Sequence, residues 1–216
     1  MKPFLIILIS LTSILNALGQ SGVADSNGFT NKAEAKNLTA HGKKAGKWVE
    51  YLDEFAERAV SNAHAKKAPY YRLTIYSDGL PYGLVRTYNM GGKLKIIIPY
   101  VNGKINGIEK WYYEDGGLEW ELPFTDSVLN GVEKLYYPNG NLSQIDTMSS
   151  GKPIGIEKSY YPDGQLKGYE PFNNGMANGI KKTYYESGKL SYEYIYKNDT
   201  ILSTKHYDEN GNEIKQ

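Results

Sequence analysis

The chain has 216 residues with 25 Lys or Arg, 24 Asp or Glu and no cysteine. A net charge of +1 argues against a nucleic-acid partner, which would need a basic stripe, and gives no support for a polybasic protein of the membrane surface. The absence of cysteine excludes disulfides, thiolate metal sites and a cysteine nucleophile.

Residues 1–19 have the pattern of a signal peptide. Met1 and Lys2 give a short basic start, and Ala17-Leu18-Gly19 places small residues where a signal peptidase cuts. A membrane anchor is the alternative, but the apolar run from Phe4 to Leu18 has only about 15 residues, and roughly 20 are needed to span a bilayer. We therefore expect a mature chain that begins near Gln20, has no membrane span, and is exported to the periplasm or outside the cell.

Two irregular segments follow. Residues 20–40 are polar and small, and we expect a disordered leader. Residues 41–82 resemble a degenerate first repeat, because Gly46 and Tyr51 keep the spacing of the later repeats. An insertion at about 53–67 has apolar residues at helical spacing and ends before Pro69. It predicts one short helix that covers an end of the sheet.

From residue 83 to residue 216 the chain repeats with a period of 24 residues. Two glycines and a tyrosine recur in each unit, so the glycines are predicted to be structural. The first glycines are Gly83, Gly107, Gly131, Gly155 and Gly179, and the second are Gly92, Gly116, Gly140, Gly164 and Gly188. The last unit is degenerate, because Ser203 stands where the period predicts glycine.

Each unit has two stretches rich in Tyr, Ile, Val and Leu, separated by turn residues. Pro162-Asp163-Gly164 is typical of a tight hairpin in which glycine takes a positive φ, and Asn174-Gly175 marks a second turn. A period of 24 residues is too short for two helices with their loops. We predict an all-β repeat protein: an elongated antiparallel sheet of about six hairpin units.

Alternation along the strands divides the side chains between two faces. We assign Ile108 and Tyr112 to the packed side, so that the second tyrosine of each pair faces outward. The predicted exposed row, our candidate binding site, consists of Trp111, Tyr113, Tyr137, Tyr161 and Tyr185. Aromatic rings with polar tips suit protein partners and sugar faces, although they could equally serve only to cover the sheet.

The pattern G-[IVL]-x-x-x-Y-Y-x-x-G-x-L resembles the variant MORN repeat, as in proteins of the YwqK-type antitoxin family. The resemblance covers residues 83–211 closely and residues 41–76 loosely. It implies an elongated antiparallel sheet and a role in binding rather than in catalysis.

No catalytic motif or phosphate-binding loop occurs, and His41, His64 and His206 are too scattered to form a metal site. Glu109, Glu133 and Glu157 recur in register, but equivalent residues would lie about 10 Å apart, so we interpret them as solvated charges rather than a glycosidase pair. We predict no enzyme, no metal and no cofactor.

The function predicted from the sequence is that of an exported, non-catalytic scaffold that binds a protein partner, as an antitoxin, immunity protein or adaptor does. The alternative is a module that binds glycans of the cell envelope through the aromatic row. The sequence does not distinguish these two, and it does not indicate the oligomeric state.

Overall fold

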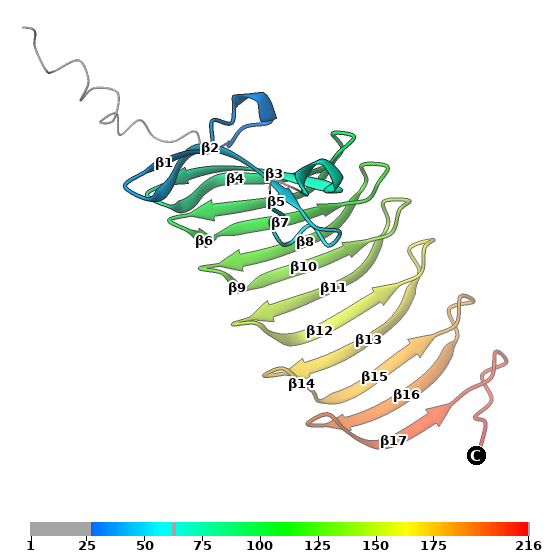
Figure 1. The fold of residues 1–216 in the computed structure, drawn as a ribbon. Coiled ribbons are helices and arrows are strands. Elements are labelled where there is room, and N and C mark those ends of the chain that lie inside the picture. The colour runs from blue at the N-terminus through cyan, green and yellow to red at the C-terminus, as the bar shows by residue number, and fades with distance from the viewer. Residues whose placement is uncertain (1–26, 62–63, 216) are drawn as a thin grey trace, which may run out of the picture.

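The computed structural model describes residues 27–61 and 64–215, which form one antiparallel sheet of 17 strands (Figure 1). Each long strand pairs with the next long strand of the chain, and the two-residue strands β6, β9 and β14 pair with the strand before them, so the sheet grows in one direction from β1 to β17. The predicted all-β fold of stacked hairpins is confirmed. The predicted signal peptide, residues 1–19, lies outside the described residues.

The strands are β1 (Leu38–Ala40), β2 (Lys43–Leu52), β3 (Tyr70–Ser77), β4 (Leu80–Asn89), β5 (Leu94–Val101), β6 (Lys104–Ile105), β7 (Gly107–Tyr112), β8 (Leu118–Thr125), β9 (Val128–Leu129), β10 (Gly131–Tyr136), β11 (Leu142–Ser149), β12 (Lys152–Tyr160), β13 (Leu166–Asn173), β14 (Met176–Ala177), β15 (Gly179–Tyr184), β16 (Leu190–Lys197) and β17 (Thr200–His206). Two short 3-10 turns, η1 (Lys32–Glu34) and η2 (Ala65–Lys67), complete the elements. The described residues contain no α-helix.

The predicted tight turns form one long edge of the sheet, which we call the tight-turn edge. In the turn of residues 137–141, the N–H of Gly140 donates to the carbonyl of Tyr137 at 2.9 Å, and the same pairing recurs in the units on either side. Gly140, Gly164 and Gly188 have φ values of 85°, 91° and 79°, as the turn assignment predicts. Glycine is favoured there because a side chain would strain this left-handed conformation.

The opposite edge carries two-residue turns in which both residues have positive φ, the geometry of type I′ turns. They fall at Asp78-Gly79, Asn102-Gly103, Asp126-Ser127, Ser150-Gly151, Asn174-Gly175 and Asn198-Asp199. Where glycine is missing, the side chain adds a bond to the preceding unit: Ser127 Oγ accepts the N–H of Ile105 at 2.9 Å, and Asp199 accepts that of Ala177 at 2.7 Å. Each unit is therefore tied to the one before it at this edge.

The first glycine has a different role from the glycine of the tight turn at Gly107, Gly131 and Gly179, whereas a Cβ at Gly155 would meet nothing within 4 Å. Gly131 has a φ of 127°, and a Cβ at this position would lie 3.0 Å from the ring of Pro123 on the neighbouring strand. At Gly164 a Cβ would meet nothing within 4 Å, so only the positive φ of 91° opposes a side chain. The first site combines backbone strain with a clash, whereas the second has strain alone.

We expect Gly131→Ala to lower the free energy of unfolding by about 2 to 3 kcal/mol and Gly164→Ala by about 1 kcal/mol. Chemical denaturation of the two variants beside the wild type measures the difference. Equal losses would mean that the contact between Gly131 and Pro123 does not constrain the sheet.

The predicted helix at 53–67 is wrong. The Asp53 carboxylate accepts the backbone N–H groups of Phe55, Glu57 and Arg58, and Ala56 takes a φ of 60°, which no right-handed helix allows. The segment turns back onto β2, where Val60 donates its N–H to Tyr51. The apolar spacing therefore reflects a loop that buries Ala56 and leaves Phe55 exposed.

The leader of residues 20–40, expected to be disordered, is ordered in residues 27–40, and residues 20–26 lie outside the described residues. It includes η1, whose first turn is capped by the side chain of Asn31, and β1, which pairs with β2. Phe29 is buried in a core cluster with Tyr71, Leu73 and Ile75 of β3. This contact is the physical reason for the order, since an aromatic side chain gains free energy by covering an apolar sheet.

Burial is therefore uneven along the sheet. One face of β2–β5 carries the cluster of Phe29 and Leu73. On the other face Ala56, in the loop after β2, packs with Leu52 and Ile96. The largest fully buried side chains all lie between residues 52 and 87. In the described units after β7 most side chains are only half-buried, because the sheet there is a single layer.

Candidate binding surfaces of the sheet

The strand register defines two faces in the repeats. Residues that lie opposite each other on paired strands share a face, and neighbours along a strand alternate. We call the face with Glu109, Glu133 and Glu157 the inner face, and the face with Ile108 and Ile156 the outer face. The inner face is the one that the loop after β2 covers at the N-terminal end, where Ala56 packs near Trp111.

The burial of these residues reverses the predicted faces. Glu109 and Glu133 are only 7% and 9% exposed, whereas Ile108 and Ile156 are 48% and 53% exposed. The prediction that Ile108 lies on the packed side is wrong, and so is the interpretation of the recurring glutamates as solvated charges. The inner face is the more crowded side of the sheet, and its carboxylates are enclosed by their neighbours.

A row of acidic side chains crosses the middle of the inner face. Glu133 on β10 lies opposite Asp146 on β11, and Glu157 on β12 lies opposite Glu170 on β13. Four consecutive strands thus place a carboxyl group at equivalent positions, and we call these residues the acidic row. Lys181 on β15 ends the row and pairs with Glu170 at 2.8 Å.

The donors to these carboxyl groups are unevenly distributed. Indole N–H groups serve the first two of the recurring glutamates: Trp111 donates to Glu109 at 2.6 Å, and Trp120 donates to Glu133 at 2.8 Å. Asp146 receives only one bond, from the amide of Gln144 to Oδ2 at 3.3 Å, and its buried Oδ1 has no hydrogen-bond partner among the described residues. Asp146, in the middle of the acidic row, therefore receives fewer hydrogen bonds than a buried carboxylate needs.

These surroundings raise the pKa values of inner-face carboxyl groups. Burial raises the pKa of Glu133, Asp146 and Glu157, and it also raises that of Glu109. The charge of Asp146 raises the pKa of Glu133 and of Glu157 further. The carboxyl groups of the row are therefore easier to protonate in the folded chain than in the unfolded one.

We expect the acidic row to make the folded chain more stable as the pH falls from neutral toward about 4, the ordinary pKa range of carboxyl groups. An acid whose pKa is higher in the folded state destabilises that state above the folded pKa and has no effect below the unfolded pKa, so the penalty disappears as the pH falls through this window. Urea midpoints at several pH values measure the trend, and Glu133→Gln with Asp146→Asn should flatten it. A wild-type midpoint that falls over the same window would contradict the assignment.

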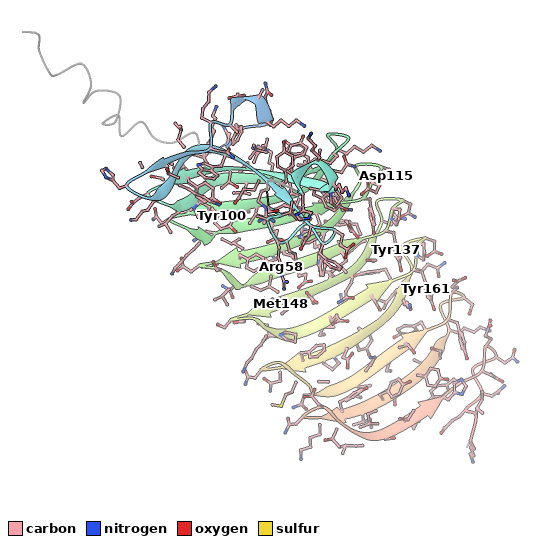
Figure 2. All side chains as sticks on the ribbon, in the orientation of Figure 1. Arg58, Tyr100, Asp115, Tyr137, Met148 and Tyr161 are labelled. Carbon is pink, nitrogen blue, oxygen red and sulfur yellow. The ribbon has the colours of Figure 1, made fainter. Side chains whose placement is uncertain are left out.

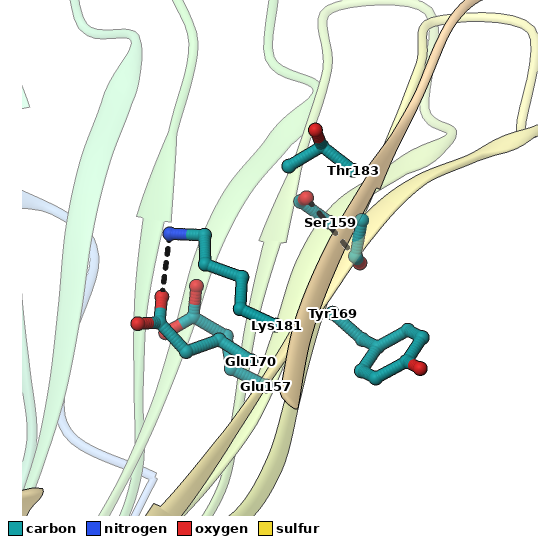
Figure 3. A pocket seen from close by; sticks show the side chains of 7 residues that line it. Glu157, Ser159, Tyr169, Glu170, Lys181 and Thr183 are labelled. Carbon is teal, nitrogen blue, oxygen red and sulfur yellow. Dashed lines mark hydrogen bonds and ion pairs between the residues drawn. The ribbon is translucent and has the colours of Figure 1, made fainter. Parts of the chain in front are cut away.

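Beside the acidic row the inner face is hollowed where its side chains become small. On each strand, the neighbouring inner-face residue is two positions away from the one aligned with the acidic row. In the earlier strands this residue is Trp111, Trp120 or Leu135. On β12, β13 and β15 the same position is held by Ser159, Gly168 and Thr183. These three residues form a pocket together with Glu157, Glu170 and Lys181 (Figure 3).

The outer face carries an exposed apolar stripe, which consists of Ile108, Val132, Ile156 and Ile180. Each is 44–53% exposed, and each occupies the same position in its unit, 24 residues after the one before. Pro123 lies opposite Ile108 and Pro171 lies opposite Ile156, so apolar side chains fill neighbouring strands as well.

Lysines run alongside this stripe, two residues further along each strand: Lys110, Lys134, Lys158 and Lys182. Lys110 and Lys182 pair with Glu121 and Glu193 on the same face. Lys134 and Lys158 form no ion pair within the described part of the chain. The outer face therefore presents apolar side chains bordered by lysines, of which Lys134 lies opposite Glu121 and Lys158 lies opposite Ile145 and Tyr169.

The predicted aromatic row does not form one exposed surface, and none of its five members is among the exposed residues. Trp111 lies on the inner face, with its indole N–H bound to Glu109. Tyr137 and Tyr161 lie at the tight-turn edge (Figure 2). The tyrosine hydroxyls donate to backbone carbonyls of the next unit: Tyr113 to Tyr136 at 2.6 Å, Tyr137 to Tyr160 at 2.7 Å, Tyr161 to Tyr184 at 2.7 Å and Tyr185 to Tyr207 at 2.8 Å.

This hydroxyl ladder explains why the second tyrosine of each pair recurs. A phenol at this position satisfies a carbonyl of the following unit while its ring covers the edge of the sheet. The ladder has the same period as the repeat and needs no ligand. Whether these residues also contact a partner stays a prediction.

The sequence did not single out Asp146 or Glu170 as members of the site. They belong to the second strand of their units and become neighbours of Glu133 and Glu157 only through the register. A sequence signal existed in Gln144-Ile145-Asp146, where polar side chains alternate at positions that hold Trp120 and Leu122 one unit earlier.

The three histidines do not meet, and in residues 27–61 and 64–215 no three His, Asp or Glu side chains are grouped as a metal site would require. In the same residues no helix has the length and apolar character to cross a bilayer.

The geometry defines this chain as an all-β repeat protein, a single sheet built from antiparallel hairpins. Four segments match the MORN repeat variant, at residues 105–126, 129–149, 153–174 and 177–198. Their starts are 24 residues apart, in agreement with the period of the glycines. No curated protein showed significant similarity to the chain.

Proposed function

We propose that the protein is an exported, non-catalytic scaffold that binds a protein partner through the outer face of its repeats. The observation that carries this proposal is the apolar stripe of Ile108, Val132, Ile156 and Ile180, repeated on four units and left exposed in each. Exposed apolar side chains in a continuous row are characteristic of interaction sites.

The dimensions and charge of the stripe indicate the kind of partner. Strands lie about 4.8 Å apart, so the three periods from Ile108 to Ile180 extend over roughly 30 Å, enough to receive an extended segment or a helix. The lysines beside the stripe favour a partner whose apolar ridge is bordered by acidic side chains. An antitoxin, immunity or adaptor role would use such a surface, and the signal-peptide pattern of residues 1–19 supports export.

The test compares isoleucines of the stripe with an exposed isoleucine outside it. Ile180 in the stripe and Ile214 near the C-terminus are both 44% exposed. The immobilised mature chain is used to capture proteins from the exported fraction of its own host, and the affinity of each captured protein is then measured with purified components.

We expect the double variant Ile156→Asp with Ile180→Asp to lose binding and Ile214→Asp to keep it, with all variants folded by circular dichroism. A partner that binds both variants equally would place its site elsewhere. Binding to anionic lipid vesicles instead of to any protein would replace the proposal with one of membrane attachment.

Glycan binding remains the second candidate, and one observation favours it. Tyr192 and Tyr194 on the inner face of β16 stack with ring centroids 5.7 Å apart, and His206 stacks on Tyr192 at 4.2 Å. Flat aromatic surfaces of this kind suit the apolar faces of sugars. Retention on a cell-envelope polysaccharide that is lost in Tyr192→Ala with Tyr194→Ala would support this alternative.

A further inference from the structure

Negative charge is concentrated at the centre of the inner face. The acidic row places four carboxyl groups on consecutive strands, and only Lys181 faces them from the end of the row. The nearby lysines Lys134 and Lys158 lie on the outer face, because they stand next to Glu133 and Glu157 along the strand.

Asp146 is an independent indication of a missing donor. Its side chain is 8% exposed, and its Oδ1 has no hydrogen-bond partner among the described residues. Asp146 lies opposite Glu133 on β10, and its neighbour Ile145 lies opposite Lys158 on β12, the residue next to Glu157. A buried carboxylate oxygen without a donor is costly, and a ligand that supplies an N–H group would remove this cost.

The pocket beside Glu157 provides space for such a ligand. Its floor is formed by Ser159, Gly168 and Thr183, and the side chains of Glu157, Glu170 and Lys181 stand along one side of it (Figure 3). A Cβ on Gly168 would lie 2.8 Å from the carbonyl of Lys182, so this part of the floor must remain backbone. The pocket therefore lies next to Glu157, a carboxyl group that forms no ion pair within the described part of the chain.

We propose that Asp146 and Glu157, with the pocket over Gly168, form a binding site for an organic cation that carries an ammonium or guanidinium group. The backbones of adjacent strands lie about 4.8 Å apart. One positive group with several N–H donors can therefore donate to carboxylates on two adjacent strands. A metal ion suits the site less well, because no three acidic or histidine side chains of the described residues are grouped as metal ligands. This site is on the opposite face from the proposed partner stripe and does not depend on it.

The test uses two cations and a neutral isostere. Acetyl-arginine amide represents an arginine side chain, spermidine represents a free polyamine, and acetyl-citrulline amide has the shape of the arginine compound without its charge. Isothermal titration calorimetry with the full mature chain measures each affinity at constant ionic strength.

We expect saturable binding of at least one cation and none of the citrulline compound. Asp146→Asn with Glu157→Gln should weaken the binding by about tenfold or more, since the partner charge is lost. The control Glu186→Gln removes an exposed acid at the tight-turn edge and should leave the affinity unchanged. Removing buried charges is not expected to unfold the sheet, and a thermal melt of each variant checks this.

The outcome also identifies the source of the cation. Preference for the arginine compound would indicate a side chain of a protein ligand, and preference for spermidine would indicate a free amine. The proposal is overturned if neither cation binds saturably, or if the Asp146/Glu157 variant is folded and binds as well as the wild type. Neither result would affect the test of the outer face, which uses different residues and a different ligand.

Discussion

Deletion of residues 131–154 is expected to leave a folded protein that is one unit shorter. The deletion joins Asn130 to Gly155, which has the same place in its unit as Gly131. Lys158 then takes the place of Lys134 opposite Glu121, and the hydroxyl of Tyr113 finds the carbonyl of Tyr160 in place of that of Tyr136. Because contacts are made between adjacent units, the remaining units keep their surroundings.

Deletion of only residues 131–142 is expected to abolish the fold. It removes β10 and one tight turn, so the remaining part of β11 follows β9 directly. Ile145 would take the inner-face place of Glu133, and Asp146 would take the outer-face place of Lys134, which exchanges the two faces of the sheet. The next type I′ turn would also fall at the wrong edge.

Circular dichroism and size-exclusion chromatography of the two deletions distinguish these results. The longer deletion acts as the control for the shorter one, since it removes more of the chain. If both deletions unfold the protein to the same degree, the sheet behaves as a single cooperative core rather than as a row of units.

The sequence predicted the architecture because the repeat determines it through the backbone. A glycine with positive φ at residues 92, 116, 140, 164 and 188 fixes the tight turns, and the 24-residue period fixes the number of strands in each unit. These are local properties, and a single sequence contains them. The prediction of a helix at 53–67 was wrong for a local reason as well. The side chain of Asp53 accepts three backbone N–H groups and so stabilises a loop, which the helical spacing of apolar residues does not indicate.

The two faces were predicted the wrong way round because the rule that apolar side chains lie on the packed side does not hold for this single-layer sheet. Apolar side chains normally occupy the packed side of a sheet, and this rule places Ile108 there. In a single-layer sheet neither face is covered by a second layer, and burial comes from crowding on the inner side. Tryptophan N–H groups then make buried glutamates tolerable at residues 109 and 133.

The candidate cation site could not be predicted from the sequence either. Its members come from neighbouring strands of three units, and only the register brings Asp146 next to the strand of Glu157 and places Glu170 opposite Glu157. The hollow depends on Gly168, which the repeat pattern does not mark, since it is outside the two glycine series. A periodic sequence indicates what the units share, whereas this site arises where the units differ.

Leu73→Ala is expected to lower the free energy of unfolding of the N-terminal units by about 3 kcal/mol, the usual cost of emptying a buried leucine site. Leu73 is 0% exposed on β3, packed with Phe29 and Tyr71 where the leader covers the outer face.

Leu202→Ala provides the matched control, because this leucine on β17 is 60% exposed. We expect it to cost less than about 1 kcal/mol, the loss of strand preference alone.

Hydrogen exchange shows where the stability is lost. In a sheet whose units contact only their neighbours, Leu73→Ala should speed exchange in β2–β4 and leave β15–β17 as they are in the wild type. The N-terminal units would then act as a cap, since they bury the leader and the loop after β2 on opposite faces while the later units remain a single layer. Exchange that rises equally from β2 to β17 would instead show that the capped end and the open repeats unfold together.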